Sequence, residues 1–148
     1  YGVQALSDCR AGRATHALKQ AVLAVVVSTG LVSLLVLDQY NCAIAHSVDY
    51  GLILLPGFEK KFLHGSVVAY GVLVQLAVDQ DWDRAREVKA FLRRLEIPTT
   101  LGEMEVALDR VYLKDVLHET VTGPDMEHIP YPVTEEMIYQ AMEAVENL

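Results

Sequence analysis

Residues 21–37 form a run of 17 residues without a charged side chain, and this run limits what the chain can fold into more than any other feature. Valine and leucine dominate the run, and only Ser28, Thr29, Gly30 and Ser33 interrupt it. A helix that is apolar on every side is normally covered on every side. A membrane-spanning helix needs about 20 apolar residues and usually has basic flanks. We therefore predict a helix buried within a helical domain, and no contact with a membrane.

The rest of the chain favours further helices joined by short loops. Good N-cap residues precede three of the expected helices, at Asn41, Asp81 and Thr134. No stretch alternates strictly between apolar and polar residues, as a half-buried strand would. The sequence therefore predicts an all-α fold, a helical bundle, with helices over residues 41–54, 65–79, 82–95 and 107–120 and from residue 135 onward. Residues 58–63 are expected to form a loop, and Lys89 is expected to lie away from the apolar face of the helix 82–95.

Composition excludes several classes of function. The formal net charge is −8 and no basic run occurs, so a nucleic-acid-binding face is not expected. The sequence has neither a P-loop nor a G-x-G-x-x-G motif, so we expect no nucleotide-binding loop in this chain. An acidic chain without a signal-like segment favours a cytoplasmic protein. Because the sequence begins with Tyr1 rather than Met, we expect it to be part of a longer polypeptide.

Two histidines stand in apolar surroundings. His46 lies inside the expected helix 41–54, and His64 lies at the start of the next one, after a turn containing Pro56 and Gly57. Helices joined in this way are often antiparallel neighbours. An imidazole in an apolar wall is costly unless its ring nitrogens are engaged, either by a metal ion or by ordinary hydrogen bonds. A catalytic metal usually has three protein ligands. Asp49, one turn after His46, is a candidate either to accept a hydrogen bond from a ligand histidine or to be a solvated or capping residue.

The residues around both histidines match known motifs. The stretch 45–52 reads AHSVDYGL and the stretch 64–71 reads HGSVVAYG. Together they resemble the C-terminal helical domain of the iron-containing alcohol dehydrogenase superfamily, most closely its glycerol dehydrogenase-like branch. The resemblance continues through IPTTL at 97–101 and the helix start at 132–134, so it covers nearly the whole chain.

The resemblance implies that residues 1–148 are one helical metal-binding domain of a two-domain, metal-dependent dehydrogenase. It implies Zn²⁺ or Fe²⁺ on His46 and His64, and NAD or NADP held by an N-terminal α/β domain that this chain lacks. The family's remaining ligand, an aspartate, has no matching residue here. Asp49 and Tyr50 stand where the branch often has a further histidine, and we expect them to line the substrate pocket. The partners implied are a small alcohol, polyol or hydroxyacid, the N-terminal domain, and further copies in a homo-oligomer.

Two alternatives stay open at this point. A dehydroquinate-synthase-like lyase shares the histidine-glycine metal motif, but the basic residues that would bind phosphate are not evident around His64. A helical interaction module, with no catalysis, would also fit the high apolar content. The isolated chain is not expected to act as a dehydrogenase.

Overall fold

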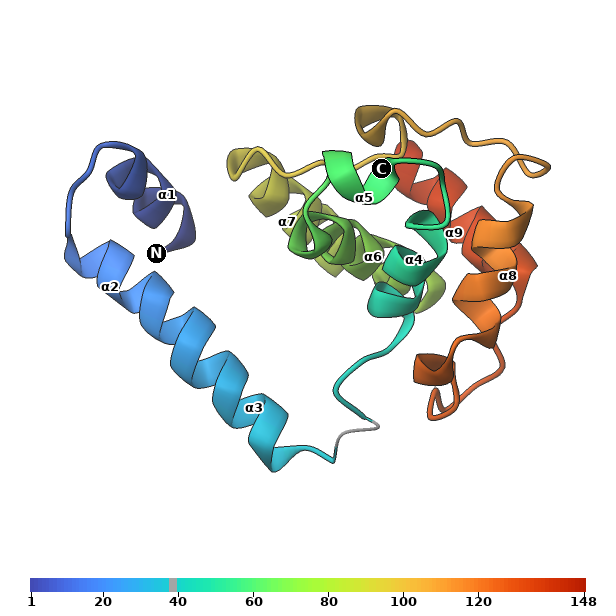
Figure 1. The fold of residues 1–148 in the computed structure, drawn as a ribbon, viewed down its shortest axis with the longest axis horizontal. Helices are drawn as coiled ribbons and strands as arrows, with labels where there is room; N and C mark the ends of the chain where they lie inside the picture. Colours follow the sequence, from blue (N-terminus) through green and yellow to red (C-terminus); the bar gives the residue numbers. More distant parts are fainter. Residues whose placement is uncertain (38–39) are drawn as a thin grey trace. The chain divides into compact units, whose positions relative to one another are not determined.

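The computed structural model describes residues 1–37 and 40–148, and every regular element in that part of the chain is a helix (Figure 1). The prediction of an all-α fold is confirmed. The chain divides into two compact units, Tyr1–Asn41 and Cys42–Leu148. Both candidate histidines, His46 and His64, belong to the second unit.

The first unit is a helical hairpin. Its short arm is α1 (Gly2–Arg10), and its long arm is a continuous helix made of α2 (His16–Leu23), the π-helical turn η1 (Ala24–Ser28) and α3 (Thr29–Leu35). The buried carboxylate of Asp8 holds the connection between the arms. It accepts hydrogen bonds from the Arg13 guanidinium at 2.7 Å and from the Thr15 hydroxyl at 2.6 Å. The Thr15 hydroxyl in turn accepts from the Leu18 backbone N–H and caps α2.

The prediction that residues 21–37 are buried is wrong for the described part of the chain. Val25, Val26, Leu34 and Leu35 are exposed, Leu34 to 83% and Leu35 to 82%. The physical reason is the shortage of covering elements, because the hairpin offers this long helix only the nine-residue helix α1.

By length and composition, His16–Leu35 is the one helix of the described residues that could cross a membrane. It has 20 residues and a mean hydropathy of 1.9. Core helices of soluble proteins and signal sequences meet the same criteria.

The second unit contains α4 (Ile44–Leu52), α5 (Phe58–Lys61), α6 (His64–Val78), α7 (Trp82–Arg94), η3 (Gly102–Met104), α8 (Lys114–Thr122), η4 (Pro124–Met126) and α9 (Glu135–Glu146). Two predicted caps are confirmed. The Asp81 carboxylate accepts from the Arg84 N–H at 3.1 Å to start α7, and the Thr134 hydroxyl accepts from the Met137 N–H at 3.2 Å to start α9.

Three segments differ from the prediction. Helix α4 begins three residues later than expected, because the Asn41 side chain donates to a backbone carbonyl in the first unit instead of capping it. Residues 58–61, expected as a loop, form the single turn α5. Residues 107–113 were expected as the start of a helix. Instead, residues 107–109 have no regular structure and residues 110–113 form a turn, in which the Asp109 carboxylate accepts from the Tyr112 N–H at 2.8 Å.

Helix α4 packs between α6 and α8, and two glycines allow the close approach (Figure 1). A Cβ atom at Gly71 of α6 would overlap the backbone carbonyl of Ala45 in α4. A Cβ atom at Gly51 of α4 would lie 2.5 Å from the Val116 carbonyl oxygen in α8. These contacts fix the position of α4, which carries His46.

Lys89 of α7 was predicted to lie on the exposed face of its helix, and it is buried instead. Its ammonium donates to the Val145 carbonyl at 2.7 Å and to the Leu148 carbonyl at 3.3 Å. These bonds place the ammonium at the C-terminal end of α9, where a helix favours a cation. Burial lowers the pKa of Lys89 from its usual value.

Candidate metal centre

Helices α4 and α6 run antiparallel where they carry the two histidines. Ala45 of α4 lies against Gly71 of α6, whereas Asp49, one turn further along α4, reaches back to His64 at the start of α6. The side-chain oxygen of Gln75 also accepts from the Ala45 N–H at 3.3 Å. This register brings residues 18 positions apart in the sequence to one end of the helix pair.

The His46 and His64 rings face each other across the helix pair. Their centroids are 5.7 Å apart and their planes are inclined by 45°. For two imidazoles on one tetrahedral zinc ion, with metal–nitrogen distances of about 2.0–2.1 Å, the ring centres lie roughly 5–6 Å apart. The observed spacing therefore fits shared ligation of a single divalent ion. The His64 side chain is 62% exposed, so an ion from solvent can reach it.

Asp49 supplies a buried carboxyl group to this site. Its side chain is 3% exposed, and its Oδ2 atom lies 2.9 Å from the Nδ1 atom of His64. Its other oxygen, Oδ1, is buried without a hydrogen-bond partner. From the sequence, Asp49 was a candidate to accept a hydrogen bond from a metal-binding histidine, because it lies one turn after His46. In the structure its partner is the other histidine, which only the antiparallel register of α4 and α6 could reveal.

A cavity of about 250 Å³ adjoins the pair, lined by Asp49, Tyr50, Ile53, Glu59, Phe62, His64 and Val67. The structure thus brings both predicted pocket residues, Asp49 and Tyr50, to the same cavity as His64. Tyr50 is half-buried. Burial, and after it the negative charge of Asp125, raises the pKa of the Tyr50 phenol above its usual value. A neutral hydroxyl at the cavity wall can donate or accept a hydrogen bond.

Within residues 1–37 and 40–148, no group of three or more His, Cys, Asp or Glu side chains is arranged to hold a metal ion. Two of the other histidines have partners of their own. The His16 ring contacts the Tyr1 ring edge-on, with centroids 5.6 Å apart, and the exposed His118 lies 3.1 Å from the Glu135 carboxylate.

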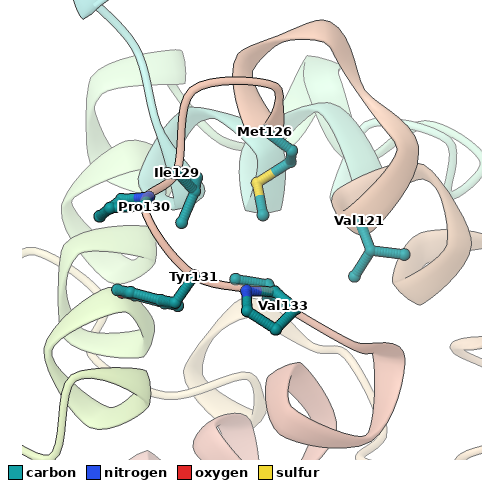
Figure 2. A pocket seen from close by; sticks show the side chains of 7 residues that line it. Val121, Met126, Ile129, Pro130, Tyr131 and Val133 are labelled. Carbon is teal, nitrogen blue, oxygen red and sulfur yellow. The ribbon is translucent and has the colours of Figure 1, made fainter.

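Sequence reasoning missed a second, larger cavity, of about 420 Å³, in the loop that precedes α9 (Figure 2). Mainly apolar side chains line it, from Val121, Met126, Ile129, Pro130, Tyr131, Pro132 and Val133. The Tyr131 hydroxyl donates to the Asp79 carboxylate, and burial together with this bond raises the pKa of Tyr131 to about 12. Neither candidate histidine reaches this cavity. The three prolines of the loop were its only signal in the sequence.

The chain is similar in sequence to known dehydrogenases. Over 146 residues the chain is 34% identical to hydroxycarboxylate dehydrogenase A of Escherichia coli (strain K12), a match that covers 97% of the chain. Over 152 residues it is 31% identical to the glycerol dehydrogenase of Thermotoga maritima, covering 99% of the chain. The chain is a relative of the glycerol and hydroxycarboxylate dehydrogenases. The resemblance seen in the histidine motifs is thereby confirmed.

The dehydrogenase relatives are much longer than this chain. The chain spans 40% of the length of each of the two proteins above, and 40% of the Pseudomonas putida glycerol dehydrogenase, to which it is 28% identical. No protein-family model matches the sequence.

Proposed function

We propose that this chain is the metal-binding part of an NAD(P)-dependent oxidoreductase that transfers hydride to or from an alcohol, polyol or hydroxyacid. The observation that carries the proposal is the pair of imidazole rings 5.7 Å apart, donated by the two motifs. The relatives reported above are named as dehydrogenases, which favours hydride transfer over the lyase alternative and over a non-catalytic module.

His46 and His64 would hold the ion, Zn²⁺ or Fe²⁺, since imidazole suits both metals. A divalent ion of this kind supplies a Lewis acid that polarises the carbon–oxygen group of the substrate. Asp49 holds the His64 ring in place, and the apolar side chains of Ile53, Phe62 and Val67 exclude water from one wall of the cavity. Tyr50 and Asp49 are placed to contact the hydroxyl groups of a substrate there.

The remaining ligand and the binding of NAD or NADP are proposed to come from an N-terminal domain. The support is that the relatives have 60% of their length beyond the part matched by this chain. The nicotinamide would accept or deliver the hydride, while this chain binds and orients the oxygen end of the substrate.

The test compares His46→Ala, His64→Ala and His118→Ala. Bound Zn²⁺ and Fe²⁺ are measured by equilibrium dialysis with elemental analysis on the chain, and NAD(P) turnover is measured on the full-length protein. We expect both site variants to lose most of the bound metal and turnover, and His118→Ala, whose side chain is 67% exposed, to retain both. Unchanged metal content in both site variants would refute the proposal.

A further inference from the structure

Helix α4 supplies two side chains to the candidate centre, not one. His46 and Asp49 are three positions apart, so they lie on the same face of the helix. The His46 ring lies 5.7 Å from the His64 ring, measured between centroids, and the Asp49 carboxylate reaches the Nδ1 atom of His64 at 2.9 Å. The same helix therefore provides one imidazole and fixes the other.

The hydrogen bond from His64 to Asp49 determines which ring nitrogen is available. When Oδ2 of Asp49 accepts this bond, Nδ1 of His64 carries the hydrogen. In a neutral imidazole the opposite nitrogen, Nε2, then has a free lone pair. Nε2 is thereby prepared to bind a cation, because a ligand nitrogen must be unprotonated.

Burying the Asp49 carboxylate costs folding free energy when no cation is nearby. Its side chain is 3% exposed, His64 is its hydrogen-bonding partner through Oδ2, and Oδ1 has none. Burying a carboxylate with so few partners destabilises the fold. A cation on Nε2 of His64 would polarise the ring, strengthen the Nδ1–H to carboxylate bond and offset part of this cost.

We propose that Asp49 is a positioning residue that fixes the Nδ1–H tautomer and the ring orientation of His64, so that Nε2 is presented to a divalent cation. The inference rests on the proposed metal function and deepens it. It assigns Asp49 to the support of a ligand rather than to contact with substrate alone.

The tautomer of His64 is measured first, because it needs neither metal nor turnover. Long-range proton–nitrogen NMR spectra of the ¹⁵N-labelled chain are recorded above the titration range of histidine, with the signals assigned through His64→Ala. We expect the Nδ1–H form in the wild type and in Asp49→Asn, whose amide oxygen still accepts the bond. Asp49→Ala should shift His64 to the Nε2–H form, and His118 serves as the internal control. An Nε2–H tautomer in the wild-type protein would overturn the proposal.

Zinc affinity is measured next, by competition dialysis on the full chain. Loss of a residue that orients a metal-binding histidine typically lowers affinity about 10–100-fold. We expect a loss of this size for Asp49→Ala and a smaller one for Asp49→Asn, which keeps the shape but not the charge. Circular dichroism checks that each variant is folded, and Asp49→Asn decides the matter if Asp49→Ala unfolds.

The two proposals fail in different ways. If His64→Ala weakens zinc binding and neither Asp49 variant does, the role of Asp49 is refuted and the metal function stands. If His64→Ala binds zinc as tightly as the wild type, the metal function itself is refuted, and the role assigned to Asp49 falls with it.

Discussion

Gly71 occupies a position where the backbone of α4 leaves no room for a side chain. A Cβ atom there would overlap the Ala45 carbonyl, which belongs to the backbone and cannot rotate away. We predict that Gly71→Ala lowers the free energy of unfolding by about 1–3 kcal/mol, despite the better helix propensity of alanine. Urea unfolding followed by the fluorescence of Trp82, the only tryptophan, measures the change.

Gly65 provides the matched control for this substitution. It lies in the same helix, and a Cβ atom there would meet nothing within 4 Å. Gly65→Ala should be neutral or should stabilise the protein by up to about 1 kcal/mol. Equal destabilisation by both substitutions would show that the contact between α4 and α6 is not as close as described.

At the level of single residues, part of the candidate site could be predicted from the sequence. His46 and His64 could be selected because imidazoles in apolar helices need a partner. The pairing of Asp49 with His64 could not be predicted, since it depends on the register between two helices. Gly51 and Gly71 belong to the recognised motifs, but no local pattern indicates that they allow backbone contacts with Val116 and Ala45.

A hydrogen-bonded turn links the end of α7 to η3. The Glu103 carboxylate accepts from the Thr99 backbone N–H at 2.6 Å and from the Thr99 hydroxyl at 3.2 Å. These bonds, together with the positive charges of Arg93 and Lys89, lower the pKa of Glu103 below its usual value of 4.5. Because the folded pKa is the lower one, this stabilisation is present above pH 4.5 and is lost as the pH falls through the folded value.

We predict that Glu103→Gln makes the protein less sensitive to acid. At neutral pH the variant should be less stable than the wild type by under about 1 kcal/mol, because the carboxylate is exposed and solvent screens its charge. Below pH 4.5 the difference should narrow. Urea midpoints across the acid range measure this, with the exposed loop residue Glu127 changed to Gln as the control. A constant difference between wild type and variant at every pH would contradict the assignment.

Elements with a strong local signal were predicted well, and those without one were not. The helices that start at Asp81 and Thr134 have a polar cap followed by a regular apolar stripe, and both were found. The turn at Asp109 replaces a helix because the Asp109 carboxylate binds the backbone N–H of Tyr112. The spacing of apolar residues carries no information about this hydrogen bond. Lys89 is buried because its ammonium binds carbonyls 56 and 59 positions later in the chain. A prediction from neighbouring residues alone cannot include partners so distant in the sequence.

The two compact units differ in how well they cover their own apolar side chains. The hydrophobic core runs from Ile44 to Val145, entirely within the second unit. The first unit leaves Leu34 and Leu35 more than 80% exposed. Exposed apolar surface of this kind promotes association.

We predict that residues 42–148 alone fold cooperatively and remain monomeric, whereas the full chain self-associates as its concentration rises. Light scattering after size exclusion measures the mass of each. Leu34→Lys combined with Leu35→Lys should reduce association of the full chain, since neither side chain is packed. If residues 42–148 associate as strongly as the full chain, the exposed helix is not the cause.

Because backbone contacts hold α4 against α6 and α8, the backbone at His46 cannot shift toward an incoming ion without displacing a whole helix. His64 is different, since it is an exposed residue in the first turn of α6 and depends on one hydrogen bond for its orientation. The His64 ring would then adjust its position to cations of different radius more readily than the His46 ring. Selectivity between ions of similar chemistry would accordingly depend on how far the His64 side chain can rotate.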